Sequence, residues 1–189
     1  MLEMSRREAT PKYLISTSLR PSKRARSFGR DLSHALINAR YVTRGKRRII
    51  DLVGLASSLR ATRLIVIQAK KGNPSKLDFY HVGCEGSYLL GSLLILGVKL
   101  VREQKHVIRA PPRARLSMLF DVFHVVDELR RATLLLPTLF DLDLASEEDR
   151  WVMKISGVGE ELSITFMDRE TTSSFGPVIR VRKIVRASS

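Results

Sequence analysis

The first part of the chain alternates a short apolar run with an amphipathic stretch. Tyr13–Ser18 predicts a short strand, and Ser22 is placed to cap a helix that begins at Lys23, because a serine hydroxyl accepts a bond from a free amide of the first turn. The apolar residues that follow recur at helical spacing and predict one buried face, made by Ala25, Phe28, Leu32, Ala35 and Leu36.

The pattern then predicts further strands and a second helix. Asn38–Thr43 indicates a short strand, and Leu64–Ile67 is a continuous apolar run, typical of an interior strand covered on both faces. Leu77–Val82 resumes an extended pattern, and Tyr88–Val101 predicts a buried strand, since it is shorter than the roughly 20 residues of a membrane span and contains Lys99. The second helix follows residue 48 and has an apolar side made by Ile49, Leu52, Val53, Ala56 and Leu59.

The last part of the chain predicts one more helix and then strands. Leu116–Arg130 is expected to be a helix, with Leu116, Leu119, Phe120, Phe123 and Val126 pointing inward. The strands are Trp151–Ser156, Leu162–Met167 and Val178–Arg186, and in the last of them Ile179, Val181 and Val185 share one face. The whole pattern predicts a mixed α/β (α+β) fold, preceded by a flexible basic arm at Met1–Pro11.

Charge narrows the class of partner. The 189 residues include 33 Lys and Arg against 19 Asp and Glu, a net charge of +14, and the pI is about 10.6. Residues 1–50 hold 13 of the cations and 3 of the acids. General solubility would explain a high charge, but such clustering favours a surface that binds a polyanion.

The candidate RNA-binding residues fall in four groups. Lys23, Arg26 and Arg30 lie on the helix face opposite the apolar one, beside Arg20 and Arg24, with Asp31 as the one acid nearby; most such stripes are solvated helix faces. The other three groups are the turn before the second helix, a Lys-Lys-Gly turn, and the polar face of the last strand. Their cations are Arg44, Lys46, Arg47 and Arg48, then Lys70 and Lys71, and then Arg180 and Arg182.

Residues that would announce catalysis or metal binding are missing from the sequence. Cys84 is the only cysteine, and His34, His81, His106 and His124 fall in separate elements without metal-ligand spacing. Asp141, Asp143, Glu147, Glu148 and Asp149 form an acidic connector that lacks the turn glycine of a calcium loop. We therefore expect no enzyme activity, no cofactor and no metal site.

Several landmarks together resemble the Brix-domain family. They are Ile15–Ser18 with Pro21 and Ser22, then RSFGRDL at 26–32, Asn38-Ala39, Arg44-Gly45, Leu64–Ile67 and Phe175-Gly176-Pro177, in that order from about Tyr13 to Val185. The resemblance implies a single Brix domain at 12–187, in two tightly packed halves at about 12–98 and 99–187, similar to anticodon-binding domains of class II aminoacyl-tRNA synthetases. Glu85–Arg115 departs from the family pattern.

The resemblance also implies a function and a compartment. A cytoplasmic factor of the minimal archaeal type is expected, binding ribosomal RNA or its precursor and assisting ribosome biogenesis, alongside other assembly proteins and away from membranes. The 12 aromatic residues (1 Trp, 4 Tyr, 7 Phe) sit largely in core patterns, which favours recognition of RNA shape over base stacking. Two alternatives stay open: an RNA-processing enzyme, and a protein-interaction module that uses Tyr88–Val98.

Overall fold

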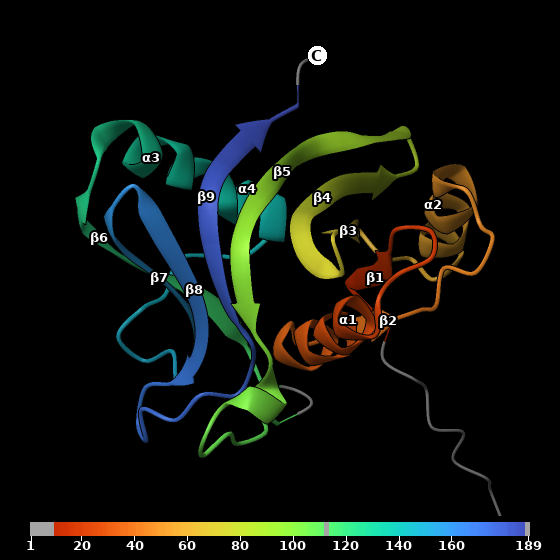
Figure 1. Ribbon diagram of the computed structural model, residues 1–189. Helices are drawn as coiled ribbons and strands as arrows, with labels where there is room; N and C mark the ends of the chain where they lie inside the picture. Colours follow the sequence, from red (N-terminus) through yellow and green to blue (C-terminus); the bar gives the residue numbers. More distant parts are fainter. Residues whose placement is uncertain (1–9, 112–113, 188–189) are drawn as a thin grey trace, which may run out of the picture.

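A computed structural model describes residues 10–111 and 114–187, so most of the expected arm lies outside the described residues (Figure 1). The first half contains β1 (Tyr13–Thr17), α1 (Lys23–Ala35), β2 (Ala39–Tyr41), α2 (Ile49–Ser58), β3 (Arg63–Lys70), β4 (Asn73–Gly83) and β5 (Gly86–Lys99). A 3₁₀ turn, η1 (Val101–Glu103), follows. The second half contains β6 (Leu116–Val125), α3 (Asp127–Ala132), η2 (Thr133–Leu135), α4 (Leu136–Phe140), β7 (Trp151–Gly159), β8 (Glu161–Asp168) and β9 (Val178–Arg186).

One nine-stranded sheet runs through both halves, in the order β2-β1-β3-β4-β5-β9-β8-β7-β6. In the first half β2, β1 and β3 are parallel, and β4 and β5 then follow antiparallel. The second half repeats this scheme, with β6 parallel to β7 and β8 and β9 antiparallel. The two halves meet where β5 pairs antiparallel with β9.

The structural repeat between the two halves includes the outermost strand pairing but lacks one helix. In the second half Leu144 forms a parallel bridge with Met118 of β6, which corresponds to the parallel pairing of β2 with β1 in the first half. Within the described residues, however, the second half has no helix in the position of α2, because the chain passes from Leu144 to β7 through turns. The outer face of β7, β8 and β9 consequently exposes polar side chains.

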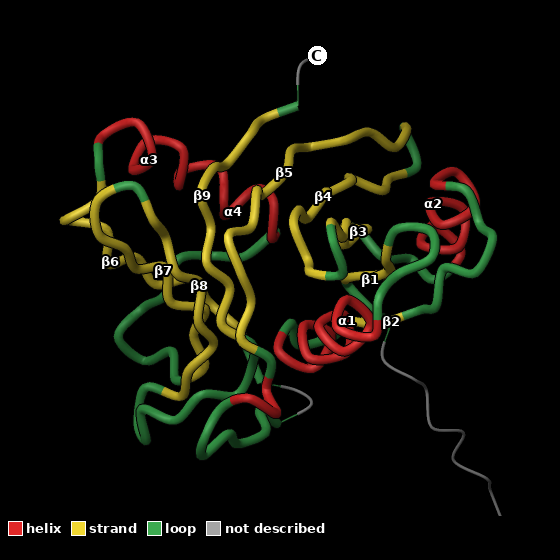
Figure 2. Tube along the Cα trace, viewed as in Figure 1, coloured by secondary structure: helices red, strands yellow, loops and turns green. Residues whose placement is uncertain are grey.

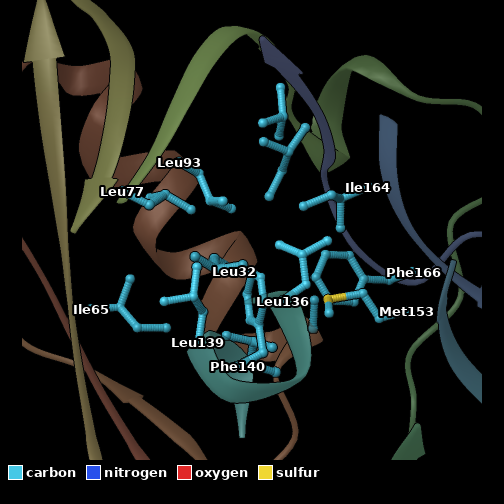
Figure 3. Close-up of a cluster of buried hydrophobic side chains, with 14 of the residues drawn as sticks. Leu32, Ile65, Leu77, Leu93, Leu136, Leu139, Phe140, Met153, Ile164 and Phe166 are labelled. Carbon is cyan, nitrogen blue, oxygen red and sulfur yellow. The ribbon is translucent and has the colours of Figure 1, made fainter. Parts of the chain in front are cut away.

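Two clusters of apolar side chains hold the layers together. The larger joins one face of the sheet to α1 and α4; Figure 3 shows Leu32 of α1 beside Leu136, Leu139 and Phe140 of α4, surrounded by side chains from the strands. The smaller packs α2 on the opposite face through Leu14, Leu52 and Leu64, among others. Alternate residues of β1 enter the two clusters, as the two-residue period of a strand requires.

The first half follows the sequence closely. Helix α1 begins at Lys23, with the Ser22 hydroxyl accepting from the Ala25 amide at 3.0 Å, and β2, α2, β3 and β4 lie where the pattern predicts them. Strand β5 is also confirmed, but its burial is not uniform: Tyr88 is 59% exposed and Leu96 41%. Since α2 covers β1 and β3 rather than β5, the outer face of β5 is left open to solvent.

Two predictions for the second half are wrong. Residues 116–125 form strand β6 rather than a helix, and only Asp127–Ala132 is helical, because pairing with β7 over most of its length outweighs the helical spacing of the apolar residues. In β9 the register beside β5 is irregular between Val181 and Lys183, so Ile184 turns inward and Val185 is 38% exposed. An inserted residue reverses the alternation that follows it.

Candidate nucleic-acid interface

The carboxyl ends of β1, β2 and β3 meet at one edge of the sheet, because these strands are parallel. Each end leads into a segment with cations: the loop before α1, the loop before α2 and the β3–β4 turn. Figure 2 shows how the loops after β1 and β2 lead directly into α1 and α2. The amide ends of both helices therefore face this edge and add partial positive charge to it.

Hydrogen bonds hold the three segments next to one another. The Ser22 hydroxyl donates to the Gly72 carbonyl at 2.6 Å, which joins the start of α1 to the β3–β4 turn. The Ser18 amide donates to the Ile67 carbonyl at 2.7 Å. Arg44 reaches back from the loop before α2 and donates to the Thr17 carbonyl at 3.3 Å. Cations far apart in the sequence are thus gathered at one place.

Most of these cations are exposed. Arg44 is 7% exposed, but seven other cations of these segments lie at the surface. We call these seven the basic edge: Arg20, Lys23, Lys46, Arg47, Arg48, Lys70 and Lys71. Among them, in the part of the chain that the structure describes, only Arg48 has a carboxylate within 4.0 Å, that of Asp51. Because so few carboxylates offset them, the edge is a surface of concentrated positive charge.

Two further predicted residues extend the basic edge along α1. Arg30 is exposed and Arg26 half-exposed, on the side opposite the buried residues of the helix. At a rise of about 1.5 Å per residue, Arg30 lies roughly 10 Å beyond Lys23 along the axis. The cations therefore form a row that starts at the edge and follows the helix.

Arg24 and Arg44 are held by contacts within the protein. The Arg24 guanidinium binds both oxygens of Glu103 and donates to the Val98 carbonyl at 2.8 Å, which ties α1 to the segment between the halves. The hydrogen bonds from Arg24 hold the pKa of Glu103 at about 2, well below its ordinary value. Arg44 donates to the Arg47 carbonyl at 2.9 Å as well as to Thr17. Both arginines position the loops that carry the other cations.

Arg180 and Arg182 lie apart from the basic edge, on β9 in the middle of the sheet. Both are exposed, and Arg180 has the Glu161 carboxylate at 4.0 Å on the neighbouring strand. A carboxylate of β8 therefore offsets part of the charge of Arg180. The structure does not bring these two residues together with the other predicted cations.

The corresponding edge of the second half has a different charge. There, β6 leads into α3 at Asp127 and Glu128, and the turn between β7 and β8 carries Glu160 and Glu161. These four acids occupy the positions that match the start of α1 and the β3–β4 turn. The start of the helix and the hairpin turn therefore carry acids in the second half where they carry cations in the first, although Arg131, Arg182 and Arg186 lie close to these acids.

Long-range ion pairs were missed by sequence reasoning. Arg63, only 8% exposed, donates to the Thr138 carbonyl at 3.1 Å and lies 3.5 Å from Asp141, which also binds Lys12. These contacts join β1 and β3 to the end of α4 and so connect the two halves. The partners are at least 75 positions apart in the sequence, and no local pattern signals such a pair.

The acidic connector has structural partners. Asp141 binds Lys12 and Arg63, Asp143 lies 3.4 Å from Arg115, and Asp149 accepts from the Ser146 amide, which lowers the Asp149 pKa. Within residues 10–111 and 114–187, no group of three His, Cys, Asp or Glu side chains is arranged to hold a metal ion. Across the same residues, every helix is too short or too polar to cross a membrane.

Similar proteins are found by sequence. A protein of Pyrococcus horikoshii, named "Probable Brix domain-containing ribosomal biogenesis protein", is 47% identical over 90 residues, 48% of this chain and 40% of that protein. A relative of the same name from Methanopyrus kandleri is 42% identical over 89 residues, 47% and 46% of the two chains. The resemblance to the Brix-domain family is confirmed. No family model matches, and the match spans less than half the length of these curated relatives.

Two solved structures resemble this chain over nearly the whole fold. The crystal structure of a "probable ribosomal biogenesis protein" from Aeropyrum pernix has a TM-score of 0.75 and 25% identity, covering 95% of this chain and 98% of that one. An archaeal Imp4-like protein matches with a TM-score of 0.64 and 22% identity, over 92% and 99% of the chains. These matches confirm the mixed α/β fold class. The similarity to anticodon-binding domains stays a prediction.

Proposed function

We propose that this protein binds structured ribosomal RNA or its precursor through the basic edge, and that it acts in ribosome biogenesis as an assembly factor without catalysing a reaction. The observation that carries the proposal is the meeting of three cation-bearing segments at one edge, while the matching helix start and hairpin turn of the second half carry acids. The names of the Brix-domain relatives, which are ribosomal biogenesis proteins, support the biological role.

The chemistry of the basic edge suits phosphates. Lysine and arginine side chains without carboxylate partners neutralise phosphates and release the counterions bound to them, and the amides of α1 and α2 favour anions at the same place. Arg24 and Arg44 fix the loops, so fewer cations need to be ordered on binding. Arg26 and Arg30 continue the charge along α1 and give the surface the length to follow a backbone.

We expect the protein to recognise the shape of the RNA rather than the identity of its bases. Among the described residues around the basic edge, the exposed large apolar side chains are Leu19 and Ile50, and both are aliphatic. Exposed aromatic rings, on which the bases of single-stranded RNA could stack, are therefore lacking among the described residues there. Contacts to phosphates and sugars of a folded RNA fit the side chains present. Arg180 and Arg182 are a secondary contact in this proposal.

A charge-reversal comparison tests it. Lys23→Glu with Lys71→Glu changes two exposed cations of the basic edge, whereas Arg40→Glu with Arg60→Glu changes two exposed cations away from it, one within β2 and one before β3. Both variants alter the net charge equally. Affinity for a transcribed ribosomal RNA is measured across a salt series, with thermal melting in parallel.

The basic-edge variant should lose affinity and flatten the log–log salt dependence by roughly 0.7 to 0.9 units for each phosphate contact removed. The control should lose much less, and both should melt close to the wild type because surface substitutions cost about 0.5 kcal/mol or less. Equal losses in the two variants would show a diffuse positive field and no site. Cleavage of the RNA that stops on Asp143→Asn would favour the enzyme alternative.

A further inference from the structure

Exposed apolar side chains gather at the end of the molecule opposite the basic edge. Strand β3 ends at the basic edge, and β4, β5 and β9 follow one another antiparallel across the sheet. Strand β5 therefore begins at the end opposite the basic edge, and β9 finishes there. The end of β6 and the β7–β8 turn lie there too. Of the eleven exposed large apolar side chains in the described residues, seven lie at this end: Tyr88, Leu89, Phe123, Val126, Leu134, Val158 and Val185.

A groove at this end lies between the helices of the second half and the two central strands. It has a volume of about 480 Å³ and is lined by Leu90 of β5, Leu134 and Leu135 of η2, Ile184 of β9, and the side chains of Arg131 and Arg186. Figure 1 shows α3 and α4 beside β9 and β5. We call this site the leucine groove.

The charges of the leucine groove are not offset. Arg131 and Arg186 are exposed, and neither has a carboxylate within 4.0 Å in the part of the chain described; Asp127, the acid at the start of α3, pairs with Arg130. Two guanidinium groups on one groove repel each other, and a carboxylate placed between them would relieve this repulsion. The groove therefore complements an anionic ligand.

The apolar lining separates this ligand from RNA. Leucine and isoleucine side chains offer no hydrogen bonds to bases, and the lining contains no aromatic ring on which a base could stack. Leu134, 78% exposed, instead offers apolar area of the kind that a side chain of another protein buries at the centre of an interface. A symmetric dimer through this groove is disfavoured, because it would place arginines against arginines.

We propose that the leucine groove binds a partner protein through a segment that carries carboxylates beside a leucine or another large apolar side chain. The apolar side chain fills the space between Leu90, Leu135 and Ile184, and the carboxylates pair with Arg131 and Arg186. Since the groove and the basic edge lie at opposite ends of the sheet, the protein binds this partner and RNA at the same time.

A peptide selection tests the proposal without knowledge of the partner. A phage library of random 16-residue peptides is selected on the purified full chain, and the most enriched peptide is labelled with fluorescein for polarisation measurements. The variants are Arg131→Glu with Arg186→Glu, and Leu134→Ser; Arg40→Glu with Arg60→Glu is the matched charge control. Melting of each variant checks that it is folded.

Support would be an enriched acidic peptide with leucine or aromatic residues, whose affinity falls at least tenfold in both groove variants and is unchanged in the control. A version of the peptide with lysine at its acidic positions should then bind the Arg131→Glu, Arg186→Glu variant better than the wild type. A lack of enrichment, enrichment of neutral or basic peptides, or binding that the groove variants do not change would overturn the proposal.

Two other results would assign the groove differently and would also overturn it. If the Arg131→Glu, Arg186→Glu variant weakens ribosomal RNA binding as much as Lys23→Glu with Lys71→Glu, the groove is part of the RNA surface. If sedimentation shows self-association that the same variant abolishes, the occupant is a second copy of the chain. Failure of RNA binding at the basic edge leaves the peptide result unaffected, so the two proposals are judged separately.

Discussion

Replacing Gly29 by alanine should destabilise the protein, although alanine is the better helix former. Gly29 lies in α1 where the helix crosses β2, and a Cβ added there would be 2.6 Å from Cε2 and 2.8 Å from Cδ2 of Tyr41, and 3.2 Å from Cδ1 of Ile67. Carbon atoms do not approach to 2.6 Å without a shift. The ring of Tyr41 or the helix itself must therefore move.

Two opposing effects set the magnitude. Alanine in place of glycine inside a helix gains about 1 kcal/mol. Inserting a methyl group into a packed contact costs typically 1 to 3 kcal/mol. With two ring carbons inside contact distance, the upper part of that range applies, and we expect a net loss of about 1 kcal/mol, or roughly 2 to 4 °C in Tm for a domain of this size.

The same substitution in a Tyr41→Ala background should have the opposite sign. Without the ring, the tight contact that remains is with Ile67 Cδ1 at 3.2 Å, the end of a side chain that needs to shift by only a few tenths of an ångström. The helix propensity then dominates, so Gly29→Ala should stabilise by up to about 1 kcal/mol. Thermal melting of the four proteins gives the coupling energy between the two positions. An equal effect of Gly29→Ala in both backgrounds would refute the close contact between α1 and β2.

Two further measurements examine contacts that fix the halves and α1. Arg63→Met should lower the unfolding free energy by about 2 kcal/mol, because it removes hydrogen bonds of a buried guanidinium and an ion pair with Asp141. Asp141→Asn should cost less, since that carboxylate is partly exposed. A larger loss for Asp141→Asn than for Arg63→Met in urea unfolding would contradict a role of Arg63 in joining the halves. The hydrogen bond from Arg24 holds the pKa of Glu103 at about 2, below the ordinary value of 4.5. The stability that the ionised Glu103 carboxylate contributes is therefore complete above about pH 4.5 and is lost as the pH falls toward 2. The Tm difference between wild type and Glu103→Gln should therefore shrink over this interval, and a constant difference would rule out the ion pair as its source.

The sequence predicted the first half well because its signals are local. A capping serine, an amphipathic helix and a continuous apolar run each mark one element, and α1, α2 and β3 formed accordingly. The prediction of a helix at residues 116–130 failed because the same apolar residues fit a helix and a strand. Pairing with β7, about 35 residues later in the sequence, decides between the two. The aromatic and β-branched content of residues 120–126 was the available signal for a strand.

The candidate site was predictable as a set of cations but not as a place. Lys23, Lys46 and Lys71 are local features, whereas their meeting at one edge follows from the parallel order of β1, β2 and β3. The internal roles of Arg24 and Arg44 depend on Glu103 and Thr17, which lie 79 and 27 residues away. A count of basic residues therefore overestimates how many are free to bind a phosphate.

The internal repeat of the fold accounts for the positions of the two surfaces proposed above. A near twofold relation between the halves sends their carboxyl edges to opposite ends of the sheet, because β5 and β9 pair antiparallel at the centre. Cations with few carboxylate partners accumulate at one of these edges, whereas the other combines carboxylates, the cations Arg131 and Arg186, and exposed apolar residues. Since α2 covers only the first half, the arrangement gives each half a different exposed surface on the same framework. The proposed sites for RNA and for an acidic protein segment therefore lie at opposite ends of the sheet.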